Sequence, residues 1–204
     1  MQFNIFPANF ICWEYVEEHK TIKEKYFNKL QSSISQLKND NGWYCDVTTS
    51  FGDANSNLNE SIFDDFFVNN VIWKYFDKLL KNRPYEFAIP KRSYVHNMWY
   101  NRYTKGQYQE IHNHSSKLDY IIEGKAFECF FSGIYILDSD EKNKTVFYEP
   151  GPLPCSSSLN GLKKFTDNIT EGNVIFFPSG LHHYVMPVEK ERTTVSFNIV
   201  SCFD

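Results

Sequence analysis

The stretch that decides the fold runs from Trp99 to His114 and reads W-Y-N-R-Y-T-K-G-Q-Y-Q-E-I-H-N-H. It covers the end of one predicted strand, residues 93–103, and the whole of the next, residues 107–114. The first run is rich in apolar and aromatic residues, a pattern typical of strands, and we expect the second, shorter run to be a strand as well. From about Ser93 onward, the sequence therefore predicts β-structure.

Downstream of this stretch, short apolar runs continue to alternate with segments rich in turn-forming residues, such as Gly151-Pro152 and Asn160-Gly161. Several short strands without helices between them are typical of a sandwich or a barrel. The further strands that we expect cover residues 127–137, 144–149, 173–177, 182–187 and 192–200.

Upstream of the stretch, apolar residues recur with the 3.6-residue period of a helix. A first helix is predicted over residues 16–38, ending at Asn41-Gly42, and a second begins at a cap provided by Asn57 or Asn59 and ends at Pro84. The apolar stripes are Ile22, Tyr26, Leu30, Ile34 and Leu37 in the first helix, and Ile62, Phe66, Trp73, Phe76 and Leu80 in the second.

Helices followed by strands predict an α+β protein, mainly β, in which the helices buttress a barrel. A chain of 204 residues has the length of one domain. We therefore expect a single domain over residues 1–204, with 1–92 as mainly helical support and 93–204 as the β core.

Composition excludes several functional classes. Apolar residues make up 42% of the chain and aromatic residues 18%, too many for a disordered protein. The net charge of −4 provides no basic field to attract nucleic acid or an anionic membrane. No apolar run approaches the length of a membrane span, and no signal peptide is evident. The five cysteines are scattered and odd in number, which favours a reducing cytoplasm.

Three histidines have the spacing of a metal site. His112 and His114 are two residues apart on a predicted strand, so their side chains share one face. His183 lies beside the strand-like run 174–177. Two ligands from one strand and a third from a distant strand leave coordination positions open for substrate and oxygen. An isolated H-x-H pair also occurs by chance, so the histidines alone do not settle the matter.

Two further pairs point to a carboxylate ligand. Arg192 and Thr194 lie on one face of a predicted strand, and an arginine fork beside a hydroxyl suits a carboxylate. Asn101 and Tyr103 share a face of the strand that precedes His112.

With these residues, the chain resembles the Fe(II)- and 2-oxoglutarate-dependent oxygenases, most closely a small phage and bacterial group that is prolyl-hydroxylase-like. The resemblance implies a double-stranded β-helix, a jelly-roll barrel like that of the cupins. Five blocks in order carry it: Trp43 to Ser50; the pattern W-x-N-x4-G-x5-H-x-H that begins at Trp99; Ser132 to Leu137; Phe177 to Val185; and Arg192 to Asn198.

The resemblance also implies roles for individual residues. His112 and His183 would bind Fe(II), and Arg192, helped by Thr194, would bind the distal carboxylate of 2-oxoglutarate. Tyr135 would donate a hydrogen bond to the same carboxylate. Asn101 and Tyr103 would line the cosubstrate site, O2 would be the second cosubstrate, and His182 would be a structural or surface residue.

The sequence departs from the wider family in two places. The usual motif is H-x-D, and His114 occupies the position of the aspartate, so His114 is expected as the third ligand, with Glu110 or Asp119 as alternatives. The segment from Lys117 to Phe131 is longer than expected. A turn at Glu123-Gly124-Lys125 predicts a hairpin there, either as a flap over the pocket or as a tolerated surface insertion.

The resemblance predicts hydroxylation of a peptidyl or small-molecule substrate, with release of succinate and CO2 and with no catalytic side chain beyond the metal ligands. Three alternatives stay open at this point. One is a three-histidine, cupin-type metalloenzyme that does not use 2-oxoglutarate, which would not need Arg192 together with Asn101 and Tyr103. Another is a non-enzymatic metal-binding module, which would not need three convergent histidines, and the third is an oxygenase fold that has lost its activity. The sequence leaves the oligomeric state open.

Overall fold

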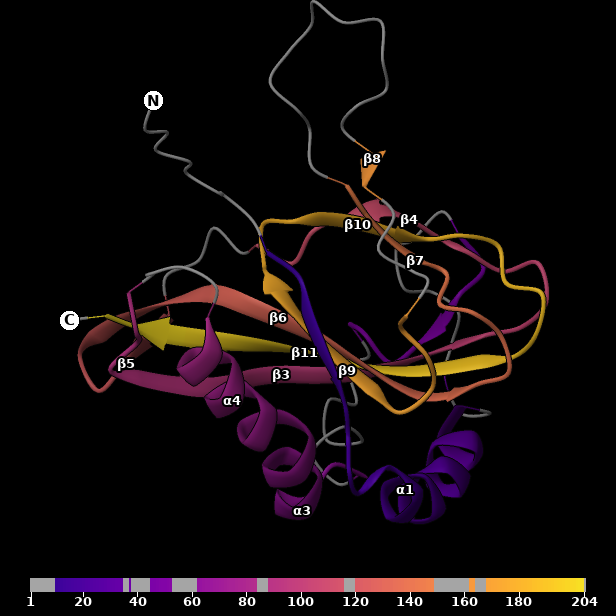
Figure 1. The fold of residues 1–204 in the computed structure, drawn as a ribbon, viewed down its shortest axis with the longest axis horizontal. Coiled ribbons are helices and arrows are strands. Elements are labelled where there is room, and N and C mark those ends of the chain that lie inside the picture. Colours follow the sequence, from indigo (N-terminus) through magenta and orange to yellow (C-terminus); the bar gives the residue numbers. More distant parts are fainter. Residues whose placement is uncertain are drawn as a thin grey trace, which may run out of the picture.

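Two antiparallel β-sheets face each other, and helices cover the outer side of the larger sheet (Figure 1). The computed structural model describes residues 10–34, 37, 45–52, 62–83, 88–115, 120–148, 162–163 and 168–203. Within these residues most of the regular structure is strand, so the expected mainly β class is confirmed.

The larger sheet contains seven of the described strands, in the order β1-β9-β6-β11-β3-β2, with β5 paired to β6. Its two central strands, β6 and β11, are long and pair with each other over most of their length. The bounds are β1 Cys12–Tyr15, β2 Thr48–Thr49, β3 Arg92–Tyr103, β5 Tyr120–Ile122, β6 Lys125–Ser139, β9 Asn173–Pro178 and β11 Arg192–Cys202.

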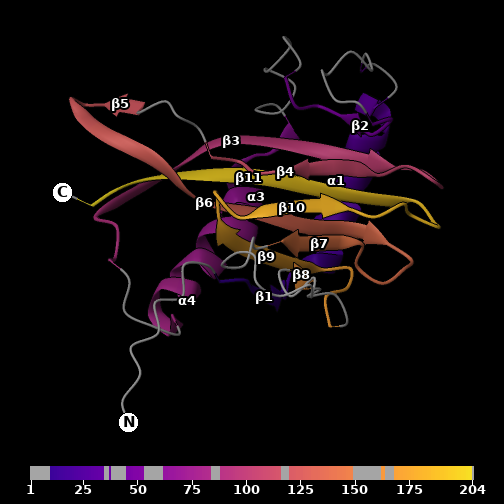
Figure 2. The ribbon, with the colours of Figure 1, turned by 90° about the horizontal axis from the view of Figure 1, so that it is seen from above.

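The smaller sheet lies over the inner face of the larger one, and most strands of both run along the long axis of the molecule (Figure 2). Its order among the described strands is β4-β10-β7-β8. Because β4 and β10 are neighbours here, segments far apart in the sequence lie side by side. The bounds are β4 Gln109–His112, β7 Thr145–Tyr148, β8 Leu162–Lys163 and β10 His182–Val185.

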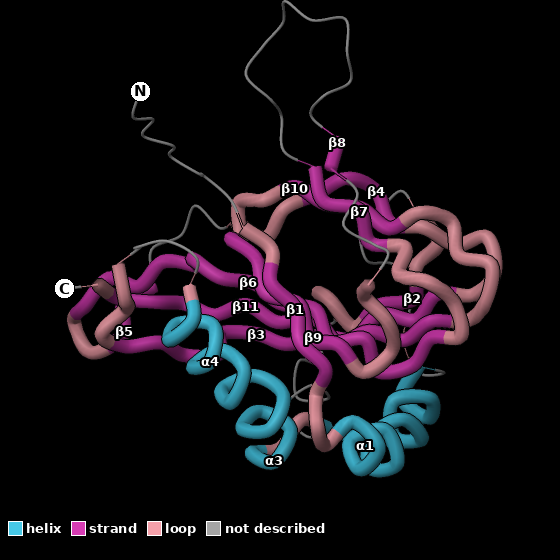
Figure 3. Tube along the Cα trace, in the orientation of Figure 1, coloured by secondary structure: helices cyan, strands magenta, loops and turns pink. Residues whose placement is uncertain are grey.

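The helices pack on the face of the larger sheet that points away from the smaller sheet (Figure 3). Helix α1 covers His19–Ile34, and α3 Asp65–Phe67, the π-helical η1 Val68–Trp73 and α4 Lys74–Asn82 follow one another without a break. The side chain of Asp64 accepts a hydrogen bond from the Phe67 amide and so caps this second run. The expected caps and stops at Asn41-Gly42, Asn57, Asn59 and Pro84 lie outside the described residues.

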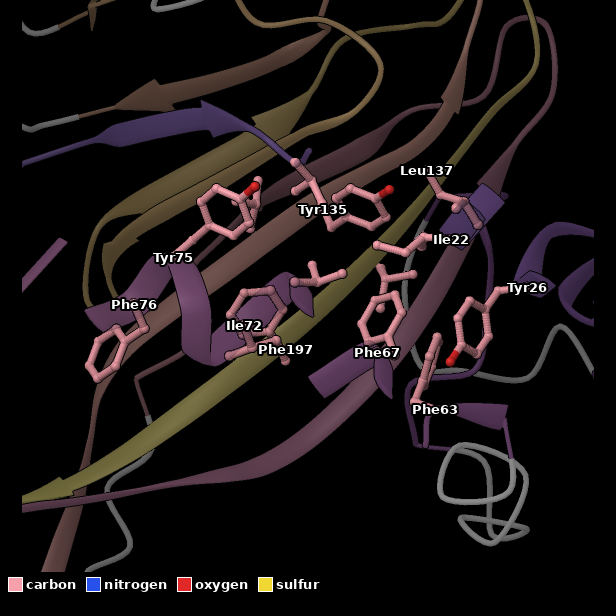
Figure 4. Packing of buried hydrophobic residues seen from close by; sticks show 14 of the residues in the cluster. Ile22, Tyr26, Phe63, Phe67, Ile72, Tyr75, Phe76, Tyr135, Leu137 and Phe197 are labelled. Atoms are coloured by element: carbon pink, nitrogen blue, oxygen red, sulfur yellow. The ribbon is translucent and has the colours of Figure 1, made fainter. Parts of the chain in front are cut away.

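Aromatic side chains fill the layer between helices and sheet (Figure 4). Tyr26 and Phe67 come from the helices, and Tyr135 and Phe197 come from β6 and β11. None of the four is more than marginally accessible to solvent. Full burial of a side chain of this size contributes about 1.5–3 kcal/mol, so this layer holds the helices against the sheet.

The N-terminal region contributes strands as well as helices to the sheet. β1 pairs with β9, and Thr48-Thr49 pairs with β3. The expectation that residues before 93 give mainly helical support missed both strands. At four and two residues they are too short to produce a readable period.

The expected hairpin in the segment from Lys117 to Phe131 is present, with Tyr120 opposite Phe127 and a two-residue turn at Glu123-Gly124. Phe127 is buried against Val200 and Cys202 of β11. The described part of this segment therefore extends the larger sheet and does not form a flap.

None of the described helices is long and apolar enough to cross a membrane.

Candidate metal and cosubstrate site

A narrow cavity between the two sheets brings together residues from both. The larger sheet contributes alternate residues of β3 and β11, and the smaller sheet contributes β4, β7 and β10. The cavity is lined by Trp99, Asn101, Tyr103, Gln109, His112, His114, Ile134, Thr145, His183, Val185, Arg192, Thr194 and Ser196.

His112, His114 and His183 form a cluster at one end of this cavity. One potential ligand nitrogen from each lies within 4.8 Å of the others. His112 and His183 are direct partners in the β4–β10 pairing, and their ring centres are 4.3 Å apart. The ring centre of His114 lies 4.8 Å from that of His183. The expected histidine triad is therefore assembled, at separations that a single ion could bridge.

Hydrogen bonds on the far side of each ring set the tautomer needed for metal binding. Nδ1 of His112 lies 2.8 Å from the Glu110 carbonyl oxygen, and Nδ1 of His183 lies 3.2 Å from that of Leu181. Nδ1 of His114 lies 3.1 Å from Oδ1 of Asn198. An acceptor at each of these positions requires Nδ1 to carry the proton, so every Nε2 keeps its lone pair for a metal ion.

Burial keeps the three imidazoles neutral. Desolvation lowers the pKa of His112, and it lowers the pKa of His114 to about 3, with the neighbouring His112 adding to the effect. The pKa of His183 falls well below its usual value for the same reason, reinforced by His114 and His112. Neutral imidazole is the form that binds a metal ion, so the triad is ready for one at neutral pH.

Glu110 does not join the triad, because a β-bulge moves it. The pairs His183–His112 and Val185–Gln109 are separated by two residues on β10 and by three on β4, so β4 carries one extra residue. Simple alternation from His112 would have put Glu110 on the cavity face, and the bulge puts Gln109 there instead. The other alternative, Asp119, lies outside the described residues.

Arg192 lies fully inside the cavity wall, with only 1% of its surface exposed. Its Nη2 donates to Oδ1 of Asn143 at 3.1 Å and to Oγ1 of Thr145 at 2.8 Å. Among the described residues, Nε and Nη1 of Arg192 have no hydrogen-bond partner. Burial lowers the pKa of Arg192, and the neighbouring Tyr103 and Glu141 oppose this shift.

The other expected cosubstrate residues surround Arg192. Thr194 follows it on the same face of β11, while Asn101 and Tyr103 face the cavity from β3, where Tyr103 is directly opposite Arg192 in the pairing. Oδ1 of Asn101 is buried and has no hydrogen-bond partner within the described part of the chain.

Polar residues that sequence reasoning missed complete this wall. The hydroxyl of Tyr103 donates to Oε1 of Gln109 at 2.7 Å, and Asn143 and Thr145 hold Arg192. Only a structure that places β4 and β7 opposite β3 and β11 identifies them, because no motif marks them in the sequence.

Tyr135 does not reach the cavity, which corrects the role expected for it. On β6, Ile134 faces the cavity, and Tyr135 faces the helices. Its hydroxyl lies 2.7 Å from Nδ1 of His19. Tyr135 therefore helps to hold α1 on the sheet.

His182, which we expected to be a structural or surface residue, is half-buried. Its Nε2 lies 3.2 Å from Nδ2 of Asn113, within hydrogen-bond distance.

Several solved structures have the same fold. The viral collagen prolyl hydroxylase of Paramecium bursaria Chlorella virus 1, in complex with 2-oxoglutarate, is 13% identical at a TM-score of 0.53, over 93% of this chain and 96% of that one. A prolyl-4-hydroxylase from Pseudomonas putida is 11% identical at 0.57, over 96% and 94%. HygX from Streptomyces hygroscopicus, with nickel, 2-oxoglutarate and hygromycin B bound, is 12% identical at 0.55, over 95% and 83%. At these identities the likeness shows the fold.

The family is shown by the sequence. A search of curated proteins found no match. A family model with the description "Putative 2OG-Fe(II) oxygenase" matches residues 97–198, half of the chain, and this range contains all the cavity residues named above. The chain therefore belongs to the 2OG-Fe(II) oxygenases, which use Fe(II) as cofactor and 2-oxoglutarate and O2 as cosubstrates.

Proposed function

We propose that this oxygenase hydroxylates a peptidyl or small-molecule substrate, with His112, His114 and His183 binding Fe(II) and Arg192 binding the distal carboxylate of 2-oxoglutarate. The observation that carries the proposal is the buried Arg192 guanidinium, with two nitrogens unpartnered among the described residues and in the same cavity as the histidines. A buried cation of this kind calls for an anionic ligand.

The donor set fits Fe(II). Imidazole nitrogens suit iron, and three protein ligands leave positions open for a chelating cosubstrate and O2. Three neutral imidazoles leave the ion its full double charge, which a dianionic cosubstrate would neutralise. When bound, iron and 2-oxoglutarate supply the activated oxygen, with release of succinate and CO2.

Arg192 and its neighbours would orient the cosubstrate. A guanidinium can donate two parallel hydrogen bonds to a carboxylate, and Thr194 adds a hydroxyl from the same strand face. Asn143 and Thr145 accept hydrogen bonds from Nη2 and hold the guanidinium in place. Asn101 and Tyr103 would line the space between the arginine and the metal, so the protein's part in the reaction is positioning and the exclusion of water.

Two aromatic side chains, Phe51 and Trp99, lie next to the metal site and indicate what kind of substrate would bind there. The ring of Phe51 is 39% exposed and packs 5.0 Å from that of Trp99, whose ring lies 5.1 Å from His114. An apolar part of the substrate would bind against these rings. Fold relatives include a prolyl hydroxylase with a peptide fragment and HygX with hygromycin B. We therefore propose a peptide or a small metabolite, and no nucleic acid.

The cupin-type alternative, a histidine site without 2-oxoglutarate, gives the buried Arg192 no role. The family match over residues 97–198 also favours the oxygenase.

We further propose that residues 1–204 form one domain and that the protein works in a reducing cytoplasm. The cysteines that the structure describes, Cys12, Cys45, Cys129 and Cys202, are all free thiols, as that compartment would keep them.

A turnover assay tests the substrate class. The protein is incubated with Fe(II), O2 and 2-oxoglutarate, and succinate is measured in the presence of panels of peptides and metabolites. We expect Fe(II)-dependent succinate release that one class of compound stimulates, together with a mass increase of 16 Da in that compound. Stimulation by single-stranded nucleic acid alone would contradict the proposal.

A further inference from the structure

We infer that Asn198 is a positioning residue for the third metal ligand: it holds His114 in the tautomer that presents Nε2 to the ion. This inference rests on the proposed metal site at His112, His114 and His183. Asn198 lies on β11, six residues beyond Arg192 and on the same strand face, and only 7% of its surface is exposed.

Asn198 and Ser179 hold His114 from two sides. Oδ1 of Asn198 lies 3.1 Å from Nδ1 of His114, and the backbone amide of His114 donates to the Ser179 carbonyl at 2.8 Å. β4 ends at His112, so His114 stands beyond the strand and outside its pairing. These two contacts, together with packing of the ring against Trp99 and Phe177, therefore set the position of this ligand.

A hydroxyl, a second hydroxyl and a thiol form a chain of hydrogen bonds behind Asn198, and all three can donate toward its amide oxygen. Ser132 donates from Oγ to Oδ1 of Asn198 at 2.7 Å, and Oγ of Ser179 lies 2.8 Å from Oγ of Ser132. Sγ of Cys129 lies 3.3 Å from Oγ of Ser179. If each group donates to the next, all the protons point toward Oδ1. Oδ1 is then an acceptor on both sides, and His114 must supply a proton from Nδ1.

His114 differs from the other two ligands in what holds its ring. His112 and His183 use backbone carbonyls two residues upstream, and these remain whatever side chains are changed. His114 uses the side chain of Asn198. A carboxylate at position 114 has no proton for Oδ1, so it would require the amide to flip and the hydrogen-bond chain behind it to reverse. With its amide oxygen facing position 114, Asn198 therefore suits a histidine there better than a carboxylate.

Cobalt binding by the full chain tests the inference without turnover. Co(II) is titrated into wild type, Asn198→Leu, Asn198→Ala and Asn198→Asp, and its visible absorption reports both affinity and coordination. Loss of such an outer partner weakens metal binding about 10–100-fold, so we expect a drop of that size for Leu and Ala. Asn198→Asp retains the acceptor and should bind within about threefold of wild type.

A matched control removes a buried asparagine elsewhere in the same sheet. Asn173 of β9 is 6% exposed, and its side chain accepts from the Thr170 amide, away from the histidines. Asn173→Ala should leave Co(II) affinity unchanged even if it lowers thermal stability. Should both Asn198→Leu and Asn198→Ala fold and bind Co(II) within threefold of wild type, Asn198 serves packing alone and the inference is wrong.

A double-mutant cycle separates positioning from general destabilisation. In a His114→Ala background the ring that Asn198 holds is gone, so adding Asn198→Ala should change Co(II) affinity by less than about threefold. A further 10-fold loss there would mean that Asn198 acts on the site through the fold and would overturn the inference. If the wild-type protein does not bind Co(II), the proposed metal site is wrong, and the proposed function is wrong with it.

Discussion

His112 and His183 sit directly opposite each other in the pairing of β4 with β10, with their ring centres 4.3 Å apart. The two strands come from distant parts of the sequence, and the smaller sheet places them side by side. Backbone carbonyls of Glu110 and Leu181 anchor the two rings, so their arrangement does not depend on other side chains. A site held this way is formed before the metal arrives.

Replacing Arg192 separates cosubstrate binding from metal binding. Arg192→Met keeps much of the side-chain volume but removes the guanidinium. Losing one buried charge-assisted pair costs about 2–5 kcal/mol, so the affinity for 2-oxoglutarate should fall at least about 30-fold. Co(II) affinity should stay within about threefold. Calorimetric titration of each ligand measures both.

Arg102→Met is the matched control for that experiment. Arg102 lies on the neighbouring strand β3, and its guanidinium pairs with the exposed Glu191 at 3.0 Å. This change should leave 2-oxoglutarate affinity unaltered. If both arginine variants lose the same amount of 2-oxoglutarate affinity, the loss comes from a general disturbance of the sheet, and Arg192 does not contact the cosubstrate.

Acidification should destabilise the metal-free protein through its buried histidines. Burial lowers the pKa of His114 to about 3 and that of His183 well below its usual value. Below the unfolded pKa near 6.5, the unfolded chain takes up protons that the folded state does not. Each such histidine therefore lowers the free energy of unfolding by up to about 1.4 kcal/mol per pH unit as the pH falls.

Urea unfolding between pH 7 and pH 5 measures this dependence. His183→Gln should show a shallower loss of stability than wild type, because one of the responsible groups is gone. A slope equal to that of wild type would show that His183 does not stay neutral in the folded protein. Saturating Co(II) should stabilise wild type throughout, since metal binds the folded state.

Gly133 of β6 lies directly opposite Phe197 of β11 in the pairing of these strands. A Cβ built on Gly133 would be 2.1 Å from Cζ of Phe197 and 2.9 Å from the Ile175 carbonyl oxygen. Overpacking of this kind costs about 1–3 kcal/mol, so Gly133→Ala should lower the urea midpoint clearly. Gly180→Ala, where nothing lies within 4 Å, should change it little. Equal effects would mean that Phe197 moves aside freely.

The β5–β6 turn offers a stabilising change. Glu123 has a φ of 51°, a conformation that costs a side chain such as glutamate about 1 kcal/mol and asparagine less. Glu123→Asn gives up the exposed ion pair with Arg92, which contributes little. We expect a net gain of about 0.5 kcal/mol in urea unfolding, larger in 1 M salt, where that ion pair is screened. A loss of stability in both conditions would contradict this account of the turn.

Much of the site follows from local sequence pattern. Motifs point to His112, His114 and His183, and strand alternation points to the shared faces of Arg192 with Thr194 and of Asn101 with Tyr103. His114 is expected on the same strand as His112, but β4 ends at His112. Helix periodicity placed Ile22, Tyr26 and Leu30 on one stripe, and all three are fully buried. In each case the pattern is local and repeats along a single element.

Other features depend on how elements meet, and local patterns do not contain them. The bulge in β4 exchanges Gln109 for Glu110 on the cavity face, although both are polar. β6 is apolar on both faces, so nothing in its sequence decides that Ile134 faces the cavity and Tyr135 the helices. Asn198 gains a role only when β11 lies beside His114.

The most direct test of the account is whether 2-oxoglutarate binding requires both the histidine triad and Arg192. Calorimetry of 2-oxoglutarate into the protein, loaded with redox-inert Co(II) under anaerobic conditions or left metal-free, gives the answer in one series. We predict saturable one-to-one binding to the metal-loaded wild type, at least about 30-fold weaker binding without metal, and a similar loss in loaded Arg192→Met. Binding that is equally tight with and without metal, or no binding by the loaded wild type, would contradict the central claim.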